Sequence, residues 1–154
     1  MKRLLTIGMI LTFMAGMLCA CTNTDTTKEI QVEDVCTEIL SKVKFDEEPQ
    51  LADESVALAL YNIDQNDVEE FRVYMTSGAY VDEVSVWKSS NRQAVTDKIR
   101  ARIAEQKDSY LDYKAEEVPK LDQAVIYESG DYVVCCITSD AENAKQVIES
   151  CFNG

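Results

Sequence analysis

The sequence contains no histidine among its 154 residues. Hydrolases that activate serine or cysteine with a histidine base are therefore excluded, and so are zinc sites with histidine ligands. The sequence also has no C-x-x-C pair and no glycine-rich phosphate-binding loop. It offers no ordered nucleophile site, and we expect no cofactor.

Basic residues are scarce: 15 lysines and arginines stand against 28 aspartates and glutamates, which gives a formal net charge of −13. Binding to nucleic acid requires positive charge to neutralise phosphates, and broad contact with anionic lipid head groups requires it too. We therefore expect no nucleic-acid partner. A negative surface of this kind keeps a protein soluble and away from an anionic membrane.

The first residues have the layout of a bacterial signal peptide. The basic start Lys2-Arg3 precedes an uncharged stretch over residues 4–18, shorter than the roughly 20 apolar residues of a transmembrane helix. The stretch ends in LCAC, residues 18–21, which resembles a lipobox with cleavage after Ala20 and lipid attachment to Cys21. The alternative is an ordinary secretory signal in which Cys21 is incidental.

This interpretation divides the chain into three parts. Residues 1–20 form the signal peptide, residues 21–30 the lipidated cysteine with a polar tether, and residues 31–154 a single domain. Without the signal peptide, 13 basic and 28 acidic side chains remain, a formal charge of −15. We expect the mature protein to be attached to the membrane by its lipid, on the extracytoplasmic face of the cell membrane.

The apolar pattern predicts an α+β fold. Residues 32–43 and 53–61 carry apolar residues at helical spacing, so two helices are expected first. Residues 69–110 and 120–152 then each follow the order strand, strand, helix. We predict an antiparallel four-stranded sheet in a ββα-ββα arrangement, preceded by two N-terminal helices.

The sheet should be covered on both faces. Residues 132–138 are apolar at consecutive positions, which is typical of a central strand. We expect the helices of the two ββα units on one face and the N-terminal helix pair over part of the other. The basic residues of the long helix are expected on an exposed face, balanced by neighbouring acids; they are Lys98, Arg100, Arg102 and Lys107.

Two stretches resemble a known family: VEEFRVYMTSGAYVDEVSVWK from residue 68 and QKDSYLDYKAEEVPKLDQAVIYESGDYVVCCITSDAENA from residue 106. With the lipobox, they resemble a family of uncharacterised small lipoproteins of Clostridia-like Gram-positive bacteria, known as a domain of unknown function. The resemblance covers about residues 35–152 and is most specific at Met75-x-Ser77-Gly78, residues 106–113, Pro119 and Gly130-x-Tyr132. It implies a cell-envelope location, and the family has no assigned catalytic residues.

Four cysteines remain in the domain: Cys36, Cys135, Cys136 and Cys151. Cys135 and Cys136 are neighbours on a strand, so their side chains should point to opposite faces. All four fit the pattern of small buried hydrophobes. The alternative is a disulfide between Cys151 and either Cys36 or Cys136, since the expected compartment is extracellular.

Two aromatic residues are predicted to form a binding patch. Tyr74 and Trp87 are assigned to the sheet face opposite Val73 and Val86, where an aromatic surface is typical of binding sites. The alternative is that the first two helices cover both rings.

Taken together, these features favour a non-enzymatic binding or accessory module that meets an unknown protein or small-molecule partner at the membrane surface. The alternative is a small envelope hydrolase that uses carboxylates alone, since 28 acidic residues offer many pairs. A deep pocket lined by facing carboxylates would favour the enzyme.

Overall fold

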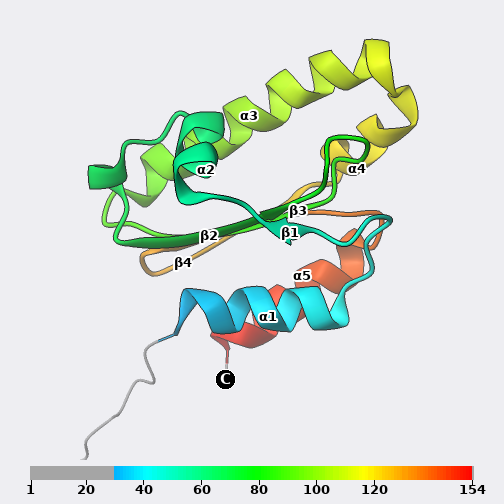
Figure 1. The fold of residues 1–154 in the computed structure, drawn as a ribbon. Helices are drawn as coiled ribbons and strands as arrows, with labels where there is room; N and C mark the ends of the chain where they lie inside the picture. Colours follow the sequence, from blue (N-terminus) through cyan, green and yellow to red (C-terminus); the bar gives the residue numbers. More distant parts are fainter. Residues whose placement is uncertain (1–29, 154) are drawn as a thin grey trace, which may run out of the picture.

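The computed structural model describes residues 30–153, which form an α+β fold. A five-stranded antiparallel sheet in the order β1-β2-β3-β5-β4 lies between two layers of helices (Figure 1). The predicted signal peptide, the cleavage site at Ala20 and the lipidation site at Cys21 lie outside the described residues. None of the helices within residues 30–153 is long and apolar enough to cross a membrane.

The helices and strands follow one another in the order predicted from residue 69 onward, with additions. Their bounds are α1 Val32–Lys42, β1 Gln50–Leu51, α2 Glu54–Tyr61, the 3₁₀ turn η1 Gln65–Asp67, β2 Glu70–Met75, β3 Glu83–Lys88, α3 Arg92–Tyr113, the 3₁₀ turn η2 Ala115–Glu117, α4 Val118–Asp122, β4 Val125–Ser129, β5 Tyr132–Ile137 and α5 Ala141–Phe152.

The sheet has five strands, so the prediction of four was wrong. The missed strand, β1, pairs with the end of β2 in the register Gln50↔Met75 and is extended by a 2.9 Å bond from Ala52 N to the carbonyl of Val73. Two residues are too few to show a period-two pattern, so β1 exists only because the chain runs along the free edge of β2.

The central position of β5 is confirmed. β5 lies between β3 and β4, and its residues from Val133 to Ile137 are all buried. β3 is its antiparallel neighbour, with Val84 opposite Cys136. Because both central strands are apolar at consecutive positions, the sheet has two apolar faces, and each needs its own cover of helices.

The helices are distributed differently from the prediction. α2, α3 and α4 cover one face of the sheet, while α1 and α5 cover the other (Figure 1). The two long C-terminal helices thus lie on opposite faces, and the N-terminal pair is split between them. The two apolar faces of β3 and β5 explain this, since α3 contributes Ile99 to one core and α5 contributes Ile148 to the other.

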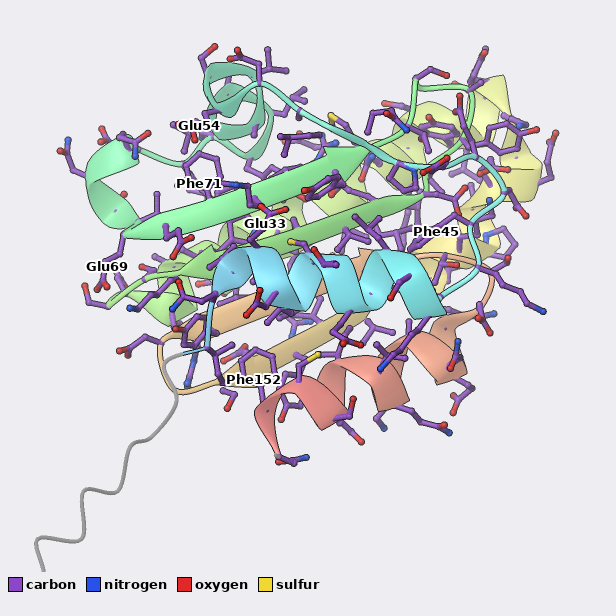
Figure 2. All side chains as sticks on the ribbon, turned by 60° about the horizontal axis from the view of Figure 1, so that its bottom comes forward. Glu33, Phe45, Glu54, Glu69, Phe71 and Phe152 are labelled. Atoms are coloured by element: carbon purple, nitrogen blue, oxygen red, sulfur yellow. The ribbon has the colours of Figure 1, made fainter. Side chains whose placement is uncertain are left out.

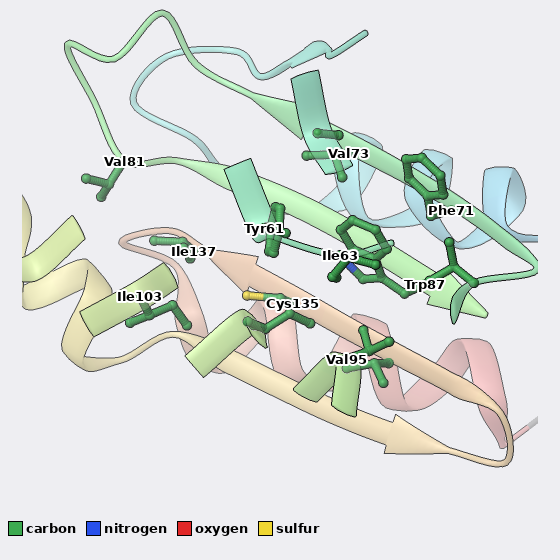
Figure 3. Packing of buried hydrophobic residues seen from close by; sticks show 14 of the residues in the cluster. Tyr61, Ile63, Phe71, Val73, Val81, Trp87, Val95, Ile103, Cys135 and Ile137 are labelled. Atoms are coloured by element: carbon green, nitrogen blue, oxygen red, sulfur yellow. The ribbon is translucent and has the colours of Figure 1, made fainter. Parts of the chain in front are cut away.

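The core under α2 and α3 is built around Trp87. Its ring stacks on Phe71 with centroids 4.9 Å apart, and Tyr61 meets it edge-on at the same distance (Figure 3). Val95 and Ile103 of α3 belong to the same core. Aromatic pairs at these distances stabilise a core beyond the area that they bury.

The second core begins where the tether meets α1. Ile30 precedes the N-cap residue Gln31, and both Ile30 and Val35 line the same hollow beside Cys151. These two positions form a hydrophobic staple, which fixes the direction in which the chain enters the helix. Tyr132 Oη donates a 2.7 Å hydrogen bond to the carbonyl of Ile30 and fastens the same point to β5.

Candidate functional site: the loop between β2 and β3

The loop over residues 76–82 joins β2 to β3 and lies beside α4 (Figure 1). It has no regular structure, yet its carbonyl groups are held in place. Thr76 Oγ1 donates to the carbonyl of Tyr80 at 2.6 Å, and Tyr110 Oη of α3 donates to the carbonyl of Gly78 at 2.7 Å. Gly78 has φ +93°, a conformation that other residues adopt only with strain.

The segment after α3 fastens the middle of the loop. Lys114 Nζ donates to the carbonyl of Ala79 at 2.8 Å and lies 3.6 Å from the centroid of the Tyr80 ring. Glu117 accepts a 3.1 Å hydrogen bond from the backbone N–H of Val81. The loop therefore depends on residues more than 30 positions away in the chain.

The segment between α1 and β1 fastens the start of the loop. Glu47 accepts from the Ser77 hydroxyl at 3.0 Å and from the Ser77 backbone N–H at 3.3 Å. Loops held on a rigid scaffold in this way are where binding residues concentrate.

A cluster of charges lies beneath the loop. Lys120 Nζ is 2.6 Å from Asp46, 2.9 Å from Asp82 and 3.0 Å from Glu117, measured to carboxylate oxygens. Burial alone would lower the pKa of Lys120, but the hydrogen bonds to the three carboxylates outweigh burial and raise it. Burial raises the pKa of Asp82, and Lys120 opposes this rise. The lysine therefore stays charged and neutralises part of the cluster.

Glu83, the residue after Asp82, anchors a second buried group on the face of the sheet that α2 and α3 cover. Tyr61 Oη donates to one Glu83 oxygen, and Arg102 Nη2 donates to the other at 2.9 Å. Burial beside this carboxylate holds the pKa of Tyr61 well above its ordinary value. The expectation of an exposed Arg102 was wrong, because its guanidinium turns inward to pair with Glu83.

A hollow of about 400 Å³ opens beside the Lys120 cluster and is lined by Asp46, Glu116, Glu117 and Lys120 among others. Asp46 and Glu117 are already ion-paired to Lys120. Glu117 also accepts the hydrogen bond from the backbone N–H of Val81, so the cluster supports the loop directly.

The predicted aromatic patch does not form. β2 and β3 pair with Phe71 opposite Trp87 and Tyr74 opposite Val84, so Trp87 shares its face with Val73 and Tyr74 lies on the other face. Trp87 is fully buried, and Tyr74 Oη donates to Glu33 of α1 at 2.8 Å. The prediction put Val73 and Val86 on the same face of the sheet. That would require β2 and β3 to pair one residue away from their actual register.

Cys36, Cys135 and Cys136 of the described domain are buried, and Cys151 is half-buried. Burial raises the pKa of Cys36 to about 12. Cys135 and Cys136 belong to different cores, as their neighbouring positions on a strand predicted. Cys36, Cys136 and Cys151 share the core under α1 and α5, and a disulfide among them stays a prediction. Within residues 30–153, no group of three or more His, Cys, Asp or Glu side chains is placed to hold a metal ion.

Comparison with known families shows which family the chain belongs to. Residues 42–138, from the end of α1 to the residue after β5, match the domain of unknown function DUF4358. The chain belongs to the DUF4358 family. No curated protein and no solved structure matches the chain. The matched segment contains the loop and every side chain described above that fastens it.

Within this DUF4358 domain, three of the four motifs that carried the resemblance lie in or beside the loop. Met75-x-Ser77-Gly78 enters the loop, the stretch 106–113 includes Tyr110, and Pro119 adjoins Lys120. The fourth motif, Gly130-x-Tyr132, lies at the opposite end of the sheet. Charge and periodicity gave no signal for this site, because it combines segments around residues 46, 77, 110 and 117 that are far apart in sequence; the motifs were the only available sign.

Proposed function

We propose that this DUF4358 protein is a lipid-anchored binding module on the outer face of the cytoplasmic membrane in Clostridia-like Gram-positive bacteria, without enzymatic activity of its own. The lipobox at residues 18–21 supports the anchor. The observation that carries the binding role is the loop over residues 76–82, which is held by side chains from three separate segments.

The proposed anchor would place the loop away from the membrane. Ile30 is nine positions after Cys21, and an extended chain of that length spans at most about 30 Å. Ile30 is bonded to Tyr132, at the end of the sheet where Lys88 pairs with Tyr132. The loop adjoins Glu83, which is at the other end of the same strand. The tether thus favours an orientation in which the loop faces outward.

Exposed apolar side chains adjoin the loop and suit a protein partner. Tyr113 and Leu111, at the end of α3, are 70% and 57% exposed. The Tyr113 ring lies 5.9 Å from the ring of Tyr110, which itself bonds to the loop. Exposed tyrosines of this kind are enriched in protein interfaces.

The anchor is tested with Cys21→Ala in the full-length chain. We expect loss of palmitate incorporation and release from the membrane fraction, or accumulation of the uncleaved precursor. Cys19→Ala is the matched control and should leave lipidation unchanged. Unchanged labelling and membrane attachment of Cys21→Ala would refute the anchor.

The binding role is tested by cross-linking the lipidated protein in cells, with a photoreactive residue at Tyr113. We expect a discrete cross-linked product that is lost when Gly78→Val distorts the loop. A product that is insensitive to the loop, or none at all, would count against the binding role.

The hollow beside Lys120 gives the second candidate, a carboxylate-dependent hydrolase of envelope material. Its acidic lining, with Asp46, Glu116 and Glu117, is the observation that favours it. Hydrolysis of cell-wall fragments by the purified protein, abolished by Asp46→Asn, would establish this alternative. Absence of turnover in the wild type would reject it.

A further inference from the structure

The outer surface of β1 and α2 is the largest gathering of exposed apolar side chains in the described domain. Five large apolar residues are exposed within residues 30–153, and three of them are here: Leu51 at 57%, Val56 at 48% and Leu60 at 42%. Val56 and Leu60 are one helical turn apart, and Val56 lines the same hollow as Leu51. We call these three residues the β1–α2 surface.

α2 has apolar residues on two sides, and only one of them has a partner in the fold. Ala57 and Tyr61 are buried against the sheet, whereas Val56 and Leu60 of the same helix are exposed. Burying Val56 and Leu60 as well would require another layer beyond α2, and the described residues supply none. Contiguous exposed apolar residues with polar neighbours are typical of interaction sites.

A groove leads from this surface to the loop. A hollow of about 310 Å³ is lined by Leu51, Val56 and Met75 on its apolar side and reaches Thr76 and Ser77. Glu47, which bonds to Ser77, also lines it. The β1–α2 surface and the loop are therefore parts of one continuous face.

The rim of the groove is acidic. Glu47, Glu48 and Asp53 line it, and Glu54 lines a smaller hollow of about 130 Å³ on the other side of Leu51. Arg72 is the one basic residue lining either hollow, and its guanidinium is within 3.6 Å of Glu54 and 3.1 Å of Glu33. Figure 2 shows Glu33 and Glu54 on α1 and α2, to either side of β2. The positive charge of Arg72 is thus already balanced.

We infer that the β1–α2 surface binds a segment of a partner protein that has apolar side chains flanked by lysine or arginine. This inference rests on the proposed binding function and adds the chemistry of the partner. The apolar side chains would bury Leu51, Val56 and Leu60, while the basic ones would face the acidic rim.

Other occupants fit the surface less well. A second copy of this chain would bring one acidic rim against another, at a formal charge of −13 for each full chain. The chain's own segment before α1 has the sequence TNTDTTKE over residues 22–29, which contains no large apolar side chain to cover the surface. A partner segment with both apolar and basic side chains would cover the β1–α2 surface and pair with its acidic rim.

The test places a photoreactive benzoylphenylalanine at Val56 or Leu60 in the full-length lipidated protein, cross-links intact cells, and identifies the captured peptide by mass spectrometry. The matched control is Gln146, which is exposed on α5 on the opposite face of the sheet. We expect Val56 and Leu60 to capture one apolar segment flanked by basic residues, and Gln146 not to capture it.

Charge reversal at the rim provides the second arm. Glu48→Lys should reduce the yield of the Val56 product several-fold, about the effect of one partly exposed ion pair and its replacement by a repulsion. Glu142→Lys on exposed α5 is the control and should leave the yield unchanged. An unchanged yield with Glu48→Lys would overturn the charge argument.

The remaining outcomes show whether the partner's chemistry, the proposed binding function or both are wrong. A product at Tyr113 without any at Val56 or Leu60 would overturn this inference and leave the proposed function standing. Products that contain only a second copy of the chain, or only uncharged or acidic segments, would also overturn it. No product at any of these positions would reject both.

Discussion

Tyr110 Oη lies 2.7 Å from the carbonyl oxygen of Gly78, and this hydrogen bond joins the end of α3 to the loop between β2 and β3 across 32 positions of sequence. The last fully buried apolar residue of α3 is Ile103, and beyond it the half-buried Tyr110 both packs against the core and bonds to the loop. The loop and the end of α3 therefore depend on each other for their positions.

Replacement of Tyr110 by phenylalanine tests this dependence. We expect Tyr110→Phe to lower the free energy of unfolding by about 1 kcal/mol, the usual net contribution of one hydrogen bond. Hydrogen exchange of the backbone amides in residues 77–81 should accelerate. Tyr113→Phe is the control because its ring is largely exposed, and exchange in the loop should then be unaffected. Equal exchange in both variants would show that the bond does not hold the loop.

Lys120 should be far more important for stability than a lysine in an exposed ion pair. Lys120→Met leaves Asp82 buried without its cation and Glu117 with only Lys114 at 3.6 Å, which we expect to cost about 3–5 kcal/mol in urea denaturation. Lys107→Met is the control: Lys107 lies 2.7 Å from Asp122, but both side chains are substantially exposed, so the loss should be about 0–1 kcal/mol. Similar losses for both variants would contradict the assigned role.

Lys120→Met should also change how the free energy of unfolding depends on pH. Burial raises the pKa of Asp82 above 3.8 and Lys120 opposes the rise, so removing Lys120 raises this pKa further. A pKa that is higher in the folded than in the unfolded state contributes stability below the unfolded value, and this contribution is lost as pH rises through the folded value. Lys120→Met should therefore gain stability relative to wild type on acidification from neutral pH toward about pH 4. A parallel pH profile for the two proteins would contradict this.

Trp87 and Tyr74 should respond very differently to truncation. Trp87→Ala removes a fully buried ring and should cost about 3–5 kcal/mol. Tyr74→Phe removes only the hydroxyl that bonds to Glu33 and should cost about 1 kcal/mol. Since Trp87 is the single tryptophan, its emission should be blue-shifted and poorly quenched by acrylamide in the wild type. Red-shifted, easily quenched emission would instead support an exposed aromatic patch.

Thiol labelling distinguishes the two interpretations of the domain's cysteines, four free thiols or one disulfide. In a chain with Cys19 and Cys21 replaced by serine, Cys151 should react first, because the other three cysteines of the domain are buried. The pKa of about 12 for Cys36 leaves almost no thiolate at neutral pH. Four thiols should react after denaturation without reductant. Only two would establish the disulfide predicted from the sequence.

Local pattern was sufficient for several features of this DUF4358 protein. Residue periodicity in sequence reflects the helix and strand repeats directly, so α1, α3, α5 and the two hairpins could be predicted. The unbroken apolar run of β5 predicted a strand covered on both faces, and the adjacency of Cys135 and Cys136 predicted their opposite directions. The lipobox interpretation likewise rests on a local pattern of consecutive residues, and it stays a prediction.

Other features depend on how distant segments meet, and no local pattern encodes that. The pairing of β2 with β3 decides that Trp87 is in one core and Tyr74 on the other face, since a shift of one residue exchanges the faces. The distribution of α3 and α5 over two faces follows from a sheet that has two apolar sides to cover. The Lys120 cluster draws on residues 46, 82 and 117, so its charges become neighbours only when the loop, the segment after α1 and α4 pack together.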